Sequence, residues 1–276
     1  MRTVLTIAGS DPSGGAGIQA DLKTFAAFGV YGASAIAAVT VQNTLGVDRV
    51  VPLEADLVEA QIEAIAGDLV LHATKTGMLA TAAIVEAVTA AIDELDLPLV
   101  VVDPVLVSTS GEALLDADGL RALKTELLPR ARVATPNVPE AEALSGRRIE
   151  SLEDARDAAC RIRDLGARAV VITGGHALGG GRTDSATDVV DLLLDGEDFH
   201  EFRVRRVDAG ATHGTGCTFA SAVAASLALG GTLPEAIARA QRYVAGALAT
   251  RPAIGRGRGV LDHFWERRPG SETPLY

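Results

Sequence analysis

The 276-residue sequence predicts an α/β protein, a three-layer sandwich in which a mostly parallel central sheet carries helices on both faces. Short and continuously apolar runs, such as residues 98–102 and 169–173, are typical of strands buried on both faces of a parallel sheet. These runs alternate with longer segments whose apolar residues recur every three or four positions, as in amphipathic helices. No repeat or low-complexity linker divides the chain. We therefore expect one domain over residues 1–250 and a partly ordered C-terminal tail over residues 251–276.

The N-terminal part begins with a strand over residues 3–8 that stops at Gly9 and is followed by the turn-forming residues 10–17. A helix is expected from Ile18 to Gly29, because its apolar residues recur at helical spacing and glycine is a common helix terminator. The further elements expected here are a single strand over 33–41, a third or edge strand over 47–53, a helix over 54–68, a strand over 71–76 and a helix over 82–95.

The C-terminal part repeats the alternation and ends in two apolar helices. Asp116 and Ser151 are residue types that accept hydrogen bonds from free N–H groups at helix starts, so we expect a helix after each of them. The expected elements are strands over 98–102, 132–135 and 169–173, an antiparallel pair over 189–194 and 201–207, and helices over 116–127, 140–144, 151–165, 220–229 and 233–248.

Composition limits the possible partners and compartment. The chain has 25 basic and 36 acidic residues, a formal net charge of −11, which disfavours electrostatic binding of nucleic acid. No apolar run reaches the ~18 residues of a membrane span, and the N-terminus lacks a signal-peptide pattern. Two cysteines, Cys160 and Cys217, indicate a reducing compartment rather than a disulfide framework. We expect a cytoplasmic protein without nucleic-acid or membrane partners.

A glycine-rich turn at residues 212–219, Thr-His-Gly-Thr-Gly-Cys-Thr-Phe, leads directly into the apolar helix expected at 220–229. Gly214 and Gly216 allow a tight turn and a close approach of the backbone to a ligand. A turn of this kind leaves several N–H groups unpaired at the positive end of the helix dipole, which favours an anion such as phosphate. A helix start that merely contains glycines is the alternative.

Polar and glycine residues follow the predicted strands, where ligands bind in open α/β sheets. These residues are Gly9 to Asp11, Gln42, Gly77, Met78, Asp103, Asn137 and Thr173 to Gly175. The phosphate-loop pattern GxxxxGK[ST] is absent. The glycines at 214 and 216 also lack the third glycine of a dinucleotide fingerprint and lie late in the chain, which argues against an oxidoreductase.

Seven segments carry a family resemblance: AGSDPSGGAGIQADLKT, TVQNTLGV, TKTGML, DPV, TPNVPEAEAL, TGGH and HGTGCT, in this order. Together they resemble the hydroxymethylpyrimidine and phosphomethylpyrimidine kinases of thiamine biosynthesis, in the ribokinase-like superfamily. The match runs from about residue 4 to residue 248. It implies ATP- and Mg²⁺-dependent phosphorylation of 4-amino-5-hydroxymethyl-2-methylpyrimidine and then of its monophosphate to the diphosphate, by an enzyme that is commonly a homodimer.

The resemblance implies that the backbone N–H groups of Gly214, Thr215, Gly216 and Cys217 hold the charge on the moving phosphoryl group. Cys217 occupies the place where many sugar-kinase relatives carry an aspartate base. A thiol at a helix N-terminus is expected to ionise more easily, so it could orient or accept the substrate proton. The alternative for Cys217 is a small buried residue in a turn. His213 is expected to be structural.

On the substrate side, the Gln42 amide offers a donor and an acceptor that match a ring nitrogen beside an exocyclic amine, although it could instead cap a loop. Gly9 would let main-chain groups reach the ring. The other substrate-binding residues are Met78, Leu106, Val41 and Asp11, and Asp11 with residues 13–17 could either shape the floor of the site or simply form a turn.

On the nucleotide side, the expected ATP-binding residues are Asp103, Asn137, Thr173 and Gly175. Asp103 and Glu140 are expected to hold Mg²⁺, which prefers carboxylate oxygen ligands. For Glu140, capping of the following helix is the alternative.

Two lysines of the family pattern are absent: Thr173 and Thr109 stand where relatives have lysine. Arg182 or Lys75 could compensate. Two rival functions remain open, a pyridoxal kinase of the same subfamily and a nucleotide-binding regulator that has lost turnover.

Overall fold

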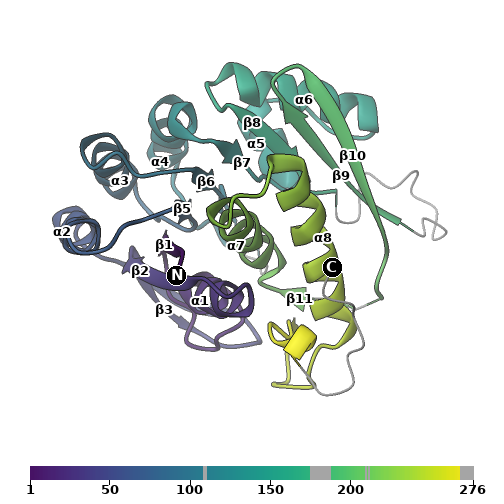
Figure 1. Ribbon diagram of the computed structural model, residues 1–276, viewed down its shortest axis with the longest axis horizontal. Helices are drawn as coiled ribbons and strands as arrows, with labels where there is room; N and C mark the ends of the chain where they lie inside the picture. Colours follow the sequence, from purple (N-terminus) through teal and green to yellow (C-terminus); the bar gives the residue numbers. More distant parts are fainter. Residues whose placement is uncertain (108–110, 175–187, 209, 211, 268–276) are drawn as a thin grey trace.

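The computed structural model describes residues 1–107, 111–174, 188–208, 210 and 212–267 of the chain. Its centre is an eight-stranded sheet, with helices on both faces (Figure 1). In spatial order, its strands are β10 (Asp198–Arg205), β9 (Asp188–Asp195), β8 (Ala169–Ile172), β7 (Val133–Ala134), β6 (Val100–Val102), β5 (Ala73–Thr76), β1 (Thr3–Ala8) and β2 (Tyr31–Ile36).

The six strands from β8 to β2 are parallel, whereas β9 is antiparallel to β8 and β10 to β9. The predicted antiparallel pair thus forms one edge of the sheet. Two small sheets complete the fold: a hairpin of β3 (Ala38–Gln42) and β4 (Val47–Pro52), and a pair of β11 (Thr212–His213) and β12 (Gly259–Val260).

The helices form two layers. One layer covers the sheet with α2 (Ala55–Ala66), α3 (Ala82–Glu94), α4 (Ala117–Ala122), α5 (Val138–Ser145) and α6 (Leu152–Asp164). The other contains α1 (Gly17–Ala27), α7 (Thr215–Ala228) and α8 (Leu233–Ala249). Shorter turns occur at Leu123–Leu127 (π-helical) and at Leu128–Arg130 and Trp265–Arg267 (3-10). This arrangement confirms the predicted fold class.

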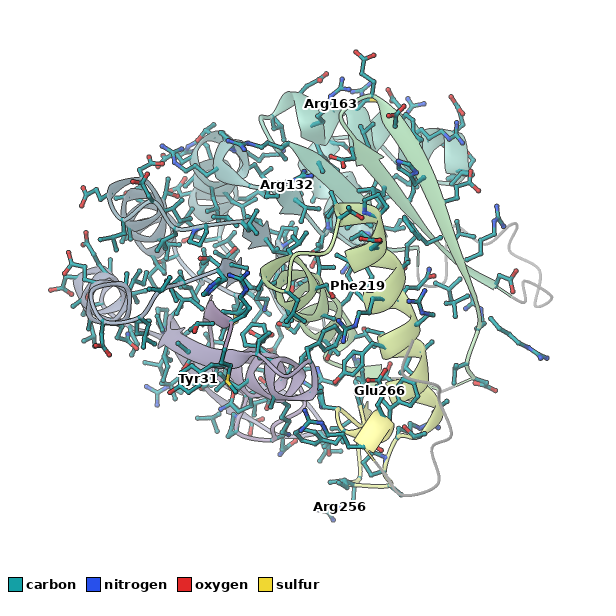
Figure 2. All side chains as sticks on the ribbon, in the orientation of Figure 1. Tyr31, Arg132, Arg163, Phe219, Arg256 and Glu266 are labelled. Carbon is teal, nitrogen blue, oxygen red and sulfur yellow. The ribbon has the colours of Figure 1, made fainter. Side chains whose placement is uncertain are left out.

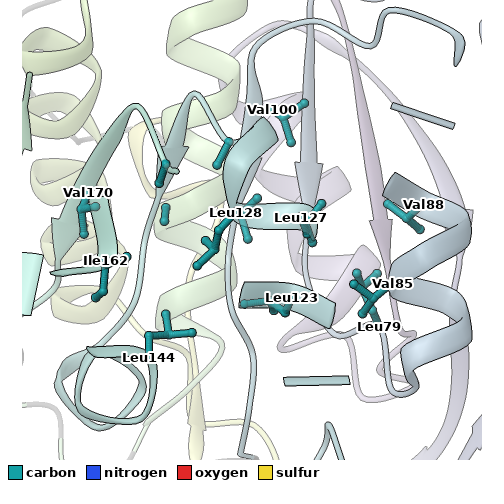
Figure 3. Close-up of a cluster of buried hydrophobic side chains, with 14 of the residues drawn as sticks. Leu79, Val85, Val88, Val100, Leu123, Leu127, Leu128, Leu144, Ile162 and Val170 are labelled. Carbon is teal, nitrogen blue, oxygen red and sulfur yellow. The ribbon is translucent and has the colours of Figure 1, made fainter. Parts of the chain in front are cut away.

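The strands are apolar throughout because alternate side chains enter different cores. In β6, Val100 and Val102 pack in the core beneath α2–α6, whereas Val101 packs in the core beneath α7 and α8. Figure 3 shows the first core, in which Ile162 of α6 and Val170 of β8 lie close together. Phe219, at the centre of Figure 2, belongs to the second core and is only 4% exposed.

The prediction of a single strand over residues 33–41 is wrong. Strand β2 pairs with β1 only as far as Ile36, opposite Ala8, because β1 ends there. Beyond Ala37 the chain finds its partner in β4 instead, antiparallel and with a bulge between Val41 and Gln42. The hairpin β3–β4 therefore leaves the central sheet and extends beside its carboxyl-terminal edge.

The described part of the C-terminal tail packs against the domain. Strand β12 pairs with β11 directly before α7, and Val260, Leu261, Asp262 and His263 are buried. The next residue, Phe264, is 40% exposed. The tail therefore supports the segment that leads into α7.

Candidate active site

A cavity of about 590 Å³ lies beyond the carboxyl ends of the parallel strands, between the hairpin β3–β4 and the start of α7. It collects thirteen of the residues predicted from the sequence: Gly9, Asp11, Gln42, Met78, Asp103, Leu106, Asn137, Glu140, Thr173, Gly214, Thr215, Gly216 and Cys217. Val41 is not among the cavity-lining residues, because it points away from Thr40 and Gln42 along β3 and is 52% exposed. Gly175, Thr109 and Arg182 lie outside the described residues.

The start of α7 forms one wall of the cavity. Gly214 is the N-cap, with a φ of 86°, and no side chain caps this end of the helix. A Cβ on Gly214 would lie 1.8 Å from the carbonyl oxygen of Gly15, so only glycine fits where these two loops meet. The first N–H groups of a helix have no partner within it, and Gly214 to Cys217 line the cavity. This end of α7 can therefore bind an anion through main-chain donors.

Cys217 lies in the first turn of α7, where its thiol is close to the Asp103 carboxylate and to the backbone N–H of Gly17. Burial raises the pKa of the thiol to about 12, although the nearby positive charge of Lys75 acts in the opposite direction. The expectation that this thiol ionises more easily than usual is therefore wrong, since desolvation by the surrounding protein outweighs the favourable charges.

Lys75 is fully buried below Cys217 and Asp103 and does not line the cavity. Its Nζ lies 3.0 and 3.1 Å from the two carboxylate oxygens of Asp21 and 3.9 Å from Asp103 Oδ2. Asp21 also accepts hydrogen bonds from the hydroxyls of Thr6 and Ser221, each at 2.7 Å. Lys75 therefore cannot replace a phosphate-contacting lysine, and it acts instead as a fixed positive charge beneath the site.

Two buried carboxylates, Asp103 and Glu140, lie on the side of the cavity for which the sequence predicts nucleotide and Mg²⁺ binding. Burial raises the pKa of Asp103 to about 6, and burial together with the nearby Asp103 raises the pKa of Glu140 to about 8. Asp103 Oδ2 is buried and accepts no hydrogen bond from the described part of the chain. Lys75 Nζ is 3.9 Å from this oxygen and balances only part of the negative charge of the two carboxylates. A cation on the cavity side would neutralise the rest, so the donor set fits Mg²⁺.

Glu140 also caps helix α5. Its carboxylate accepts from the backbone N–H of Asn137 at 2.9 Å, and the Asn137 side chain accepts from the N–H of Glu140 at 3.0 Å. The backbone N–H of Leu106 lies nearby and acts to lower the pKa of Glu140. The capping alternative is thus confirmed, and the remaining capacity of the carboxylate faces the cavity that Glu140 lines.

Thr173 is brought beside Asn137 by a parallel bridge, and its N–H donates to the carbonyl of Pro136 at 2.9 Å. The next residue, Gly174, donates its N–H to the buried carboxylate of Asp191 at 2.9 Å. These contacts hold the ends of β7 and β8 together at the cavity. At position 173, where the resembling family has lysine, this chain has the shorter polar side chain of threonine.

On the opposite side of the cavity, the amide of Gln42 lies 2.8 Å from Nε2 of His213, which in turn lies 3.2 Å from Asp11 Oδ2. Gly9 leaves room for Met78, whose Cε would lie 2.2 Å from a Cβ at position 9. The N–H of Gly9 donates to the carbonyl of Met78 at 3.0 Å. A side chain at position 9 would therefore have to displace the flexible end of Met78.

Several cavity residues were not predicted from the sequence. His213 was expected to be structural, and it contacts two polar side chains that line the cavity. Leu114, Leu115 and Leu120 add to an apolar wall with Leu106. No local signal distinguishes these leucines from core residues, because the segment that carries them is brought to the cavity only by tertiary packing.

The described residues contain no group of three or more His, Cys, Asp or Glu side chains arranged to hold a metal ion. Among the same residues, every helix is too short or too polar to cross a lipid bilayer.

The phosphomethylpyrimidine kinase family profile matches residues 11–262. The Streptomyces coelicolor hydroxymethylpyrimidine/phosphomethylpyrimidine kinase is 47% identical over 95% of this chain and 94% of its own length. The Geobacter sulfurreducens thiamine biosynthesis bifunctional protein ThiED is also 47% identical over 95% of this chain, but the chain spans only 52% of that protein.

Solved structures agree with this assignment. An ADP complex of Bacillus subtilis pyridoxal kinase is 39% identical, with a TM-score of 0.87 over 97% of this chain and 99% of that one. A phosphomethylpyrimidine kinase from Clostridium difficile is 38% identical, with a TM-score of 0.77 over 88% of this chain and 98% of that one. The profile match over most of the chain, the sequence identity and the shared fold together place this chain in the phosphomethylpyrimidine kinase family.

Proposed function

We propose that the protein transfers the γ-phosphoryl group of ATP to the hydroxymethyl group of 4-amino-5-hydroxymethyl-2-methylpyrimidine and then to the resulting monophosphate. One observation carries this proposal: a single cavity brings together the uncapped start of α7, the Cys217 thiol and the Gln42 amide. The start of α7 can stabilise a phosphoryl group, the thiol can contact an alcohol, and the amide can recognise an aminopyrimidine.

The chain's own groups supply positioning and charge neutralisation. Main-chain N–H groups of Gly214 to Cys217 stabilise charge on the phosphoryl group in flight, and in comparable sites one such donor is worth ~3 kcal/mol. Phosphoryl transfer has a largely dissociative transition state in most analyses, so little depends on a strong base. Cys217, protonated at neutral pH, orients the hydroxyl, and the Lys75 charge stabilises any thiolate that forms.

ATP lies along the side of the cavity that contains Asn137 and Thr173, at the ends of β7 and β8. Asp103 and Glu140 would hold Mg²⁺, directly or through its water ligands. The ion supplies charge neutralisation at the phosphates. The ADP complex of the related pyridoxal kinase supports nucleotide use by this fold.

The proposed assembly is a homodimer in a reducing, cytoplasmic setting. The hairpin β3–β4 exposes Val39, Val41, Leu45 and Val51, an apolar group that a second copy of the chain would cover. Both cysteines are free, in keeping with a reducing compartment. Analytical ultracentrifugation of wild type and of Val41→Lys tests the assembly, and a wild-type monomer at micromolar concentration would contradict it.

Pyridoxal kinase activity is the second candidate, favoured by the close fold match to a pyridoxal kinase. The decisive experiment incubates the protein with ATP and Mg²⁺ and either alcohol, and then determines the product masses. We expect one and then two phosphoryl groups on the pyrimidine and slower conversion of pyridoxal. Preferential conversion of pyridoxal would support the second candidate, and ATP binding without any product would indicate a regulator.

A further inference from the structure

Three segments that are far apart in the sequence meet on the substrate side of the cavity. Asp11 lies in the loop after β1, Gln42 ends β3, and His213 ends β11 just before α7. His213 Nε2 lies 2.8 Å from the Gln42 side-chain amide and 3.2 Å from Asp11 Oδ2. Since all three residues line the cavity, the proton on this imidazole nitrogen decides how the amide can meet a substrate.

Asp11 sets the direction of the first hydrogen bond. Its Oδ1 accepts from the N–H and hydroxyl of Ser13, and its Oδ2 accepts from the N–H groups of Gly15 and Ala16. Together with the bond from His213, these donors outweigh burial and lower the pKa of Asp11 to about 2. An ionised carboxylate can only accept hydrogen bonds, so His213 Nε2 must carry the proton.

The amide of Gln42 must then present an acceptor. The amide nitrogen of Gln42 lies 2.8 Å from His213 Nε2, and its oxygen accepts from Thr40 Oγ1 at 3.2 Å. Two N–H donors cannot face each other, so a protonated His213 Nε2 requires the amide to turn by about 180°, which exchanges these positions and brings Oε1 beside His213. The amide NH₂ then faces Thr40 Oγ1 and donates to that hydroxyl, and Thr40 in turn donates to the carbonyl of Ser10 at 2.9 Å. The one Nε2–H of His213 is shared between Asp11 Oδ2 and Gln42 Oε1.

The surrounding structure holds His213 in this position. Strand β11 pairs with β12, with His213 opposite Val260. Gly15 lies so close that a Cβ there would be 3.2 Å from His213 Cδ2 and 3.0 Å from a methyl group of Val260. The imidazole is therefore fixed by main-chain pairing on one side and by the Asp11 loop on the other.

We propose that His213 is a positioning residue that determines substrate specificity, because it fixes the orientation of the Gln42 amide. The Gln42 amide then has one N–H and one oxygen lone pair left to face the cavity, and the relative positions of this donor and this acceptor are fixed. This arrangement suits a ring nitrogen next to an exocyclic amine, as in a 4-aminopyrimidine. A pyridine alcohol has no amine beside its ring nitrogen. Its nitrogen can therefore accept from the amide N–H, but the amide oxygen is left without a donor. This inference rests on the proposed function and names what selects its substrate.

Kinetics test the selectivity. His213→Phe should raise the KM for the aminopyrimidine alcohol about tenfold to a hundredfold, the range expected when a buried polar group loses its partner. The KM for ATP should stay within about threefold, and the preference over pyridoxal should fall about tenfold. His213→Gln, which retains a side-chain N–H donor, should recover part of the preference. Equal losses for both alcohols, with no recovery in His213→Gln, would overturn the proposal.

A spectroscopic measurement on the wild-type protein tests the proton position independently of turnover. Two-bond ¹H–¹⁵N correlation spectra of the imidazoles, with His213 assigned by comparison with His213→Gln, distinguish a protonated from a bare Nε2. We expect a protonated Nε2, whereas a bare Nε2 would overturn the proposal even in an active enzyme. A wild-type protein with a protonated Nε2 but no pyrimidine turnover would refute the proposed function and leave the hydrogen-bond assignment standing.

Discussion

Lys75 Nζ lies 3.0 Å from Asp21 Oδ2 in a part of the core where both side chains are fully buried. The pair joins strand β5 to helix α1, and Ser221 of α7 donates to the same carboxylate at 2.7 Å. Asp21 and the other nearby anions keep the pKa of Lys75 above its usual value despite burial. A permanent positive charge therefore lies beneath Cys217 and Asp103.

Lys75→Met should destabilise the protein by about 3–5 kcal/mol, because the Asp21 carboxylate would stay buried without its counter-charge. The double variant Asp21→Asn/Lys75→Met should recover most of this loss, since neither charge remains. Urea unfolding of wild type, both single variants and the double variant measures the coupling as a double-mutant cycle. Additive effects of the two substitutions would contradict a direct pairing.

Cys217→Ala should lower kcat about a hundredfold, because the thiol that we propose to orient the substrate hydroxyl is lost. ATP affinity should change by less than about threefold, since main-chain donors hold the phosphates. The kcat of Cys217→Ser, which keeps a hydrogen-bonding group, should lie between the kcat values of wild type and Cys217→Ala. Steady-state kinetics with calorimetric ATP titrations make the comparison, and near-normal turnover of Cys217→Ala would exclude the proposed role.

Gly214→Ala should destabilise the protein by more than about 2 kcal/mol, because it combines a positive φ with a backbone clash. The new methyl group would lie 1.8 Å from the carbonyl oxygen of Gly15. Gly216→Ala is the matched control for stability, since its nearest neighbour would be Asp103 Oδ1 at 3.9 Å. Thermal unfolding of both variants decides the matter, and equal midpoints would show that the two loops do not meet as described.

Gln42→Leu should raise the KM for the aminopyrimidine alcohol at least about tenfold, since an apolar side chain cannot pair with the ring nitrogen and amine. The KM for ATP should remain within about twofold, because Gln42 lies on the other side of the cavity from Asn137 and Thr173. Initial-rate measurements with each substrate varied in turn separate these effects. A uniform change in both constants would count against recognition of the pyrimidine by this amide.

His263 predicts a pH-dependent part of the stability. Burial lowers the pKa of His263 to about 4, and its Nε2 lies 3.0 Å from Thr218 Oγ1 of α7. Because the unfolded state takes up the proton at a higher pH, this contribution is fully present above about pH 6.5 and is lost as the pH falls towards 4. The shift corresponds to about 3 kcal/mol at most.

The control for this effect is His263→Gln, in which the titrating group is absent. Between pH 7.5 and pH 4.5, the free energy of unfolding should fall more steeply for wild type than for the variant. Denaturant titrations at several pH values give both curves. Parallel curves would show that His263 does not titrate differently in the folded and unfolded states.

The sequence by itself determined the fold class and most elements, because these follow from local regularities. Continuous apolar runs predict β1, β6 and β8, and Asp116 does accept from the N–H of Gly119 as the predicted N-cap of α4. It also predicted that polar residues at the strand ends converge, since parallel strands end at one edge of the sheet. The motif around Gly214 indicated a helix start, but α7 begins at Thr215, five residues before the predicted helix over 220–229.

Only the tertiary structure decided what depends on neighbours far along the chain. The division of residues 33–41 follows from where β1 ends, and the raised pKa of Cys217 follows from burial that no local pattern reveals. The burial of Lys75 against Asp21 and the link from Asp11 through His213 to Gln42 join positions 54 to 202 residues apart. Pairing partners and desolvation are properties of the packed molecule, so a sequence pattern can indicate where such residues lie but not which groups they meet.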